Sequence, residues 1–268
     1  MIRDITLGQY YQADSVVHRL DPRTKLLGTL VYLISLFVFT KAWVFVAAAT
    51  FLLICIFLSK VPFSYMLKGL KPILFILLFT LVLNMLFTKG TVLVSWWKFS
   101  ITEEGLKQAG YMGTRLILLI LGSNLMTLTT TPTRLTNAME HVMKPLKVIH
   151  VPVHEIAMMM SIALRFIPIL LEETDRIMKA QLARGADFES GNIIKKAKSF
   201  IPVLVPLFIS AFRRANDLAM AMEARCYHGG NGRTQYRPLK YKGRDFAAYI
   251  LLLIYLAAVI VIGKFLNL

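Results

Sequence analysis

Four long apolar runs dominate this sequence, and they constrain the fold more than any other feature. They cover residues 26–58, 73–87, 106–128 and 246–266. A helix needs about 20 consecutive apolar residues to cross the hydrocarbon core of a bilayer. Only 17% of the residues are charged, whereas an ordinary soluble domain has roughly 25%. The sequence therefore predicts an all-α integral membrane protein.

The first apolar run is too long for a single span. Lys41 divides it into two pieces, and the first piece extends back to residue 20 if Asp21, Arg23 and Lys25 lie among the lipid headgroups. We therefore expect two helices joined by a tight turn at Lys41. This division gives about five transmembrane helices in the whole chain.

The basic residues are distributed unevenly along the chain. There are 31 Lys and Arg residues against 15 Asp and Glu, a formal net charge of +16. With five spans, 25 of the 31 lie on one side of the membrane, in residues 1–25, 59–72 and 129–245. Because Lys and Arg mark the cytoplasmic side of short loops, this pattern predicts a cytoplasmic N-terminus and an external C-terminus. The charge is thus explained by orientation, and we expect no nucleic-acid partner.

The chain accordingly divides into three parts. Residues 1–128 hold transmembrane helices 1–4, residues 129–245 form a cytoplasmic or interfacial region of about three helices, and residues 246–268 form the last transmembrane helix. Two apolar segments, 156–171 and 200–212, lie within the middle part. If both crossed the bilayer in a seven-span protein, six basic residues would face outward, so we favour helices that lie along the cytoplasmic interface.

A near repeat ends in an arginine in each copy. Phe166-Ile167-Pro168 is expected to begin a helix that ends at Ala183-Arg184-Gly185, and Phe200-Ile201-Pro202 one that ends at Ala224-Arg225-Cys226. The second copy is longer by seven residues, which is about two helical turns. Gly185 can supply a left-handed helix cap, and glycines after Cys226 break the second helix.

The paired arginines predict two equivalent contacts with a partner. The planar guanidinium can bond acidic side chains or backbone carbonyls in several directions. The alternative is that Arg184 and Arg225 only complement the negative ends of their helix dipoles, which contributes about 0.3 to 1 kcal/mol each. The repetition favours the contact hypothesis.

The sequence lacks the residues that several chemical functions would need. The G-x-x-x-x-G-K-[ST] phosphate loop does not occur, so the chain is not expected to hydrolyse ATP itself. The five expected spans contain no Asp or Glu, which an ion-coupled carrier would need. His150 and His154 are four residues apart, but Pro152 between them spoils a helical metal pair. We expect no metal, no cofactor and no catalytic residue.

Five segments make the chain resemble the transmembrane T component of energy-coupling factor (ECF) transporters, which are ABC-type importers of vitamins and transition-metal ions. The resemblance covers nearly the whole chain. Its Ala-Arg-Gly signature is complete at residues 183–185 and departs at its last position in Ala224-Arg225-Cys226. The other matching segments are His18-Arg19-Leu20-Asp21-Pro22-Arg23-Thr24-Lys25, Ile101-Thr102-Glu103-Glu104-Gly105-Leu106 and Arg165-Phe166-Ile167-Pro168.

The resemblance implies a non-catalytic scaffold in the cell membrane. It would join two cytoplasmic ABC-type ATPase subunits to a membrane S component that captures a vitamin or similar micronutrient. The helices of residues 129–245 would be coupling helices, and the ATPase-binding residues would be Ala183, Arg184, Gly185, Ala224, Arg225 and Cys226. The alternatives are a stand-alone membrane carrier or channel, which would work without ATPases, and a membrane-embedded enzyme, which would need a convergent polar cluster.

Overall fold

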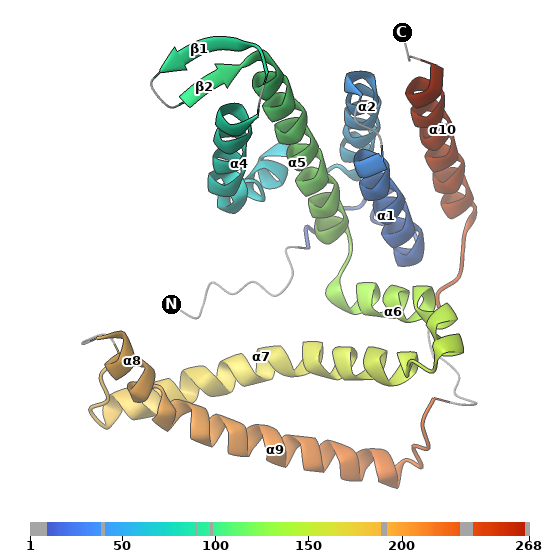
Figure 1. Cartoon of the computed structure of the whole chain (residues 1–268). Helices are drawn as coiled ribbons and strands as arrows, with labels where there is room; N and C mark the ends of the chain where they lie inside the picture. Colours follow the sequence, from blue (N-terminus) through green and yellow to red (C-terminus); the bar gives the residue numbers. More distant parts are fainter. Residues whose placement is uncertain are drawn as a thin grey trace. The chain divides into compact units, whose positions relative to one another are not determined.

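The computed structural model of the chain describes residues 10–38, 41–88, 90–96, 99–188, 192–230 and 238–265. Figure 1 shows its helices and strands. The chain forms two compact units, one within Val142–Arg237 and the other combining Gly8–His141 with Pro238–Leu268. We call the second the membrane unit and the first the helix-pair unit, and we describe each by itself.

The membrane unit contains a helix at each of the five predicted span positions. The first apolar run is divided as expected, because one helix ends at Val38 and the next begins at Ala42 with Lys41 as its N-cap. The elements of this unit are α1 (Pro22–Val38), α2 (Ala42–Ser59), α3 (Phe63–Lys68), a 3-10 turn (Lys71–Ile73), α4 (Leu74–Phe87), β1 (Val92–Trp96), β2 (Phe99–Thr102), α5 (Glu103–Thr129), α6 (Pro132–Val142) and α10 (Gly243–Phe265).

Five helical segments of the described chain are long and apolar enough to cross a membrane: Ala42–Ser59, Phe63–Phe87, Glu103–Thr129, Val153–Ala183 and Gly243–Lys264. This confirms an all-α integral membrane protein. The set includes Val153–Ala183, which we expect along the interface, and omits α1, which has only 17 residues. The interfacial position of Val153–Ala183 therefore stays a prediction.

A short antiparallel hairpin between α4 and α5 was not predicted. Ser95 pairs with Ser100, and Trp96 pairs with Phe99. The two strands are rich in β-branched and aromatic residues, which favour extended backbone. The hairpin is followed directly by α5, whose first turn is capped by the Thr102 hydroxyl accepting the Gly105 N–H at 3.1 Å.

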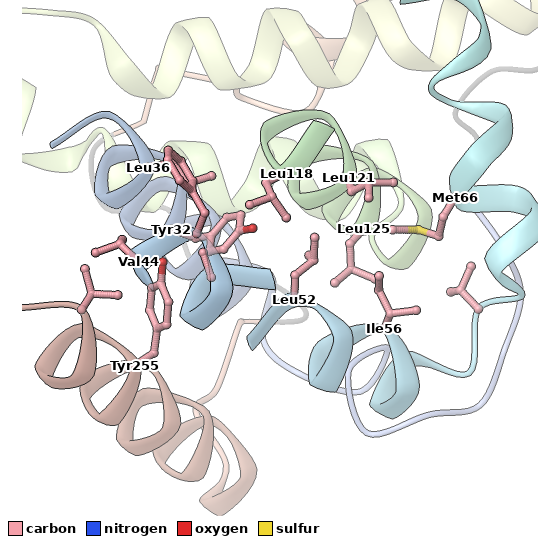
Figure 2. Close-up of a cluster of buried hydrophobic side chains, with 14 of the residues drawn as sticks. Tyr32, Leu36, Val44, Leu52, Ile56, Met66, Leu118, Leu121, Leu125 and Tyr255 are labelled. Carbon is pink, nitrogen blue, oxygen red and sulfur yellow. The ribbon is translucent and has the colours of Figure 1, made fainter. Parts of the chain in front are cut away.

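The core of the membrane unit lies where α1, α2, α5 and α10 meet (Figure 2). The Tyr255 ring of α10 stacks on Phe51 of α2 with ring centroids 4.4 Å apart, and its hydroxyl lies 2.6 Å from the hydroxyl of Ser35 on α1. Gly122 of α5 lies so close to Tyr32 that an added Cβ would be 2.7 Å from the ring. Close approach of α1 and α5 therefore depends on this glycine.

A buried polar junction joins the starts of α1 and α10. One carboxylate oxygen of Asp245 accepts the Asp21 N–H at 2.7 Å, and the other accepts the Lys242 N–H at 2.8 Å. Arg23 Nη2 donates to the Leu239 carbonyl at 3.1 Å. Buried polar groups are stable only when hydrogen-bonded. The segment of residues 18–25, which carries part of the family resemblance, thus has a structural role.

The helix-pair unit consists of a 3-10 turn (Lys144–Ile149), α7 (Val153–Ala183), α8 (Ile193–Ser199) and α9 (Ile201–Ala224). The predicted start of α9 is confirmed, because Pro202 lies in its first turn. The predicted start at Pro168 is wrong, because Pro168 lies inside α7. An internal proline costs about 3 kcal/mol, and the residues before Pro168, mostly Ala, Met, Leu and Ile, are good enough helix formers to extend α7 back to Val153.

Candidate functional site

The C-terminal end of α7 is closed by a left-handed glycine. Arg184 is the C-cap, and Gly185 follows with φ of +85°. The Gly185 N–H donates to the Leu182 carbonyl at 2.9 Å, and the Ala186 N–H donates to the Gln181 carbonyl at 3.0 Å. This pair of bonds is the Schellman motif, which satisfies the last carbonyls of a helix.

The C-terminal end of α9 has the same arrangement. Arg225 is the C-cap, and Cys226 follows with φ of +55°. The Cys226 N–H donates to the Glu223 carbonyl at 2.8 Å, and the Tyr227 N–H donates to the Met222 carbonyl at 3.1 Å. The departure from glycine at position 226 therefore does not change the backbone of the helix end.

Both arginine side chains are exposed at these helix ends. Ala183 and Gly185 beside Arg184 are exposed, and so are Ala224 and Cys226 beside Arg225. Neither guanidinium makes a side-chain hydrogen bond or ion pair with another described residue. The small neighbours leave room for a partner surface to approach each guanidinium closely. The six predicted site residues thus form two separate, matching surfaces, which we call the arginine ends.

The two arginine ends lie at opposite ends of one antiparallel helix pair. Figure 1 shows α7 and α9 side by side. Near the start of α9, Gln181 Nε2 donates to the Pro202 carbonyl at 3.4 Å, and the rings of Phe188 and Phe200 are 5.4 Å apart. After the end of α9, Gly230 lies against the ring of His154 near the start of α7. The length of α9 separates the two ends by about 36 Å.

An ion pair joins the two helices between their ends. Arg214 Nη2 of α9 lies 3.4 Å from Glu173 Oε2 of α7. The pair is partly exposed, and such pairs contribute about 1 kcal/mol or less. Together with the contacts at the two ends, it holds α7 and α9 in a defined register.

An apolar stripe follows the first half of α9. Its side chains recur at helical spacing, so they share one face, and each is at least 48% exposed. The stripe consists of Ile201, Leu204, Val205, Phe208, Ile209 and Phe212. Exposed apolar patches of this kind mark protein or membrane contacts. The apolar segment 200–212 was recognised in the sequence, and its i, i+3, i+4 spacing was the available signal for a stripe.

No metal centre is found among the described residues, because no group of three His, Cys, Asp or Glu side chains there is close enough to hold an ion. His154 is instead packed against Gly230. The notable geometry of the helix-pair unit is therefore the pair of arginine ends and the apolar stripe of α9.

Comparison with known proteins gives consistent matches over most of the chain. A family model described as cobalt transport protein matches residues 13–236. A protein of Clostridium kluyveri is 54% identical over 256 residues, covering 95% of each chain. One of Bacillus subtilis is 48% identical over 261 residues, covering 97% of this chain and 98% of its own. Both are named energy-coupling factor transporter transmembrane protein EcfT.

Proposed function

The chain belongs to the family of energy-coupling factor transporter transmembrane proteins, and on that premise we propose that it couples two cytoplasmic ABC-type ATPase subunits to a membrane S component. The S component would capture a vitamin or similar micronutrient. Substrate choice then resides in the S component, and the chain itself needs no catalytic residue and no cofactor.

The repeated arginine end is the observation that carries this proposal. Two ATPase subunits of similar structure offer two similar grooves, and the chain offers two similar helix ends about 36 Å apart. Arg184 and Arg225 would each enter one groove, where the planar guanidinium can bond carboxylates or carbonyls in several directions. Ala183, Gly185, Ala224 and Cys226 would allow the groove wall to approach the helix end.

The helix pair suits the transmission of motion. Contacts at both ends and the Glu173 to Arg214 ion pair hold α7 and α9 together. When ATP binding and hydrolysis change the distance between the ATPase subunits, both arginine ends would move with them. The apolar stripe of α9 would contact the S component and reorient it, so that its binding site opens to the cytoplasm.

The proposed orientation follows from charge. The N-terminus and the helix-pair unit would lie on the cytoplasmic side, where ATPases can reach Arg184 and Arg225, and the C-terminus would lie outside. The excess of Lys and Arg in residues 129–245 supports this assignment.

Co-purification tests the proposal. The tagged full chain is expressed with two candidate ATPase subunits and an S component, extracted in mild detergent and recovered by its tag. We expect both ATPase subunits and the S component in the eluate. Recovery of none of them would contradict the proposal, and substrate uptake by the purified chain alone in proteoliposomes would favour the carrier or channel alternative instead.

A further inference from the structure

A cavity of about 280 Å³ lies among four helices of the membrane unit. Gly28 of α1, Leu52 of α2, Leu125 of α5 and Leu252 of α10 contribute to its walls, and Val17 of the N-terminal segment also lines it. The walls are mainly apolar. A ligand in this cavity must therefore present mainly hydrocarbon.

The cavity is lined by a stretch of similar length on each of the four helices. Its lining residues run from Thr24 to Tyr32 on α1, from Leu58 back to Phe51 on α2, from Thr129 back to Gly122 on α5, and from Arg244 to Leu252 on α10. Each stretch is about two helical turns, or about 11 Å. The cavity therefore extends into the apolar interior from the level where α1 and α10 begin and α2 and α5 end.

Basic side chains lie at this end of the cavity, which we call the mouth. The buried ammonium of Lys25 donates to the carbonyls of Thr129 at 2.7 Å and His18 at 3.4 Å. These bonds use two of its three N–H groups, and no described carboxylate lies within ion-pair distance of it. Arg244 is exposed and also lines the cavity. The mouth thus carries positive charge without a matching anion among its lining residues.

The surroundings of the mouth keep this positive balance. Asp14 is paired with Arg19. The hydrogen bond from Arg19 lowers the pKa of Asp14, and the charges of Lys60 and Arg244 lower it further. Two further carboxylates, Asp21 and Asp245, lie near Lys25 at this level. Arg19 neutralises Asp14 and Arg23 lies 3.8 Å from Asp21, so Lys25, Lys60 and Arg244 stand against the one remaining carboxylate of Asp245 and the balance stays positive.

We propose that this cavity binds one acyl chain of an anionic phospholipid, with the lipid phosphate at the mouth against Lys25 and Arg244. The apolar walls match the chain, and the basic mouth matches the net negative charge of the headgroup, which a zwitterionic lipid with the same phosphate lacks. In the proposed orientation the mouth is on the cytoplasmic side, but the site does not depend on ATPase or S-component partners. A negative result for the lipid site can therefore be told apart from failure of the proposed function.

Gly28 provides a way to fill the cavity. A Cβ added at Gly28 meets no atom within 4 Å, so a large side chain has room there. Gly110 of α5 also has open space around an added Cβ, but it does not line the cavity. Gly28→Phe and Gly110→Phe are therefore a matched pair, in which only the first variant places a ring in the cavity.

Photolabelling measures occupancy directly. The full chain is reconstituted in lipid nanodiscs containing phosphatidylglycerol with a diazirine on one acyl chain, then irradiated and digested, and adducts are located by mass spectrometry. We expect adducts within residues 24–32 and 244–252. Gly28→Phe should abolish them and Gly110→Phe should retain them. Arg244→Gln should lower them about fivefold, and a phosphatidylcholine analogue should label at that lower level.

The outcomes that overturn the proposal are equally specific. Equal labelling of Gly28→Phe and the unmodified chain would exclude the cavity as the site. Equal labelling by the two lipids would exclude recognition of an anionic headgroup. Loss of labelling on co-expression of partner subunits would assign the cavity to a partner helix. If circular dichroism shows that Gly28→Phe is unfolded, Arg244→Gln with the two lipids decides the matter, because Arg244 is exposed.

Discussion

Gly185 and Cys226 occupy equivalent positions and share a left-handed backbone, with φ of +85° and +55°, although only one of them is glycine. A side chain in this conformation costs roughly 1 to 2 kcal/mol. The hydrogen bonds that close α9 therefore keep Cys226 in a conformation that glycine adopts more easily.

Replacing Cys226 by glycine should stabilise the chain. We expect Cys226→Gly to raise the free energy of unfolding by about 1 kcal/mol, because it removes the steric cost of the left-handed backbone. Gly185→Ala should lower it by a similar amount. Denaturant titration in detergent measures both changes. A lower stability for Cys226→Gly would show that the thiol makes a contact that outweighs the backbone strain.

Reversing the charge of the two arginines should separate assembly from folding. Arg184→Glu and Arg225→Glu should each weaken recovery of ATPase subunits or uncouple ATP hydrolysis from uptake. The free energy of unfolding should fall by no more than about 1 kcal/mol per site, the size of a helix-dipole effect. Lys198→Glu, at an exposed position of α8, is the charge control.

Arg184→Lys and Arg225→Lys distinguish shape from charge. Lysine keeps the charge but lacks the planar fork, so we expect partial loss of assembly. Full assembly and uptake in the double glutamate variant would instead limit both arginines to the helix dipole.

Asp245 should be essential to the junction between α1 and α10. Asp245→Ala leaves the buried Asp21 N–H and the partly buried Lys242 N–H without an acceptor, so we expect the free energy of unfolding to fall by about 2 to 4 kcal/mol. Asp245→Asn keeps one acceptor oxygen and should lower the free energy of unfolding by less. Asp217→Ala, at an exposed position of α9, should change it by less than about 0.5 kcal/mol. Thermal unfolding in detergent compares the three variants, and equal losses would remove the special role of Asp245.

His18 should make stability depend on pH. Its ring lies 2.7 Å from the Ser15 hydroxyl and 2.9 Å from the Tyr11 carbonyl, and burial lowers the pKa of His18. The unfolded chain therefore takes up a proton first, near the usual histidine pKa of about 6.5. The contribution of His18 is fully present above that pH and is lost as pH falls through its folded pKa.

Unfolding midpoints between about pH 7 and about pH 5 measure this dependence. His18→Gln should flatten the decline on the acid side, whereas His228→Gln, at an exposed position, should not. An identical decline in the unmodified chain and in His18→Gln would assign the effect to other groups.

Sequence patterns predicted the parts of this fold that depend on local chemistry. Lys41 interrupts an apolar run and occupies the N-cap position of a new helix, and Gly185 adopts the left-handed backbone that only glycine enters readily. Pro168 misled the prediction because the residues before it extend the helix across it. The left-handed backbone of Cys226 could not be predicted from residue preference, since the hydrogen bonds of the helix end determine it. The junction at Asp245 depends on contacts with Asp21, 224 positions away in the chain.

The antiparallel arrangement of α7 and α9 has a consequence for symmetry. A two-fold rotation about an axis between two antiparallel helices exchanges them, and it also exchanges their C-terminal ends. A single copy of this chain therefore presents two matching Schellman ends related by an approximate dyad, although α7 has 31 residues and α9 has 24. A partner assembly with its own two-fold axis can meet both ends equivalently, so one asymmetric chain can dock on a symmetric dimer without a second copy of itself.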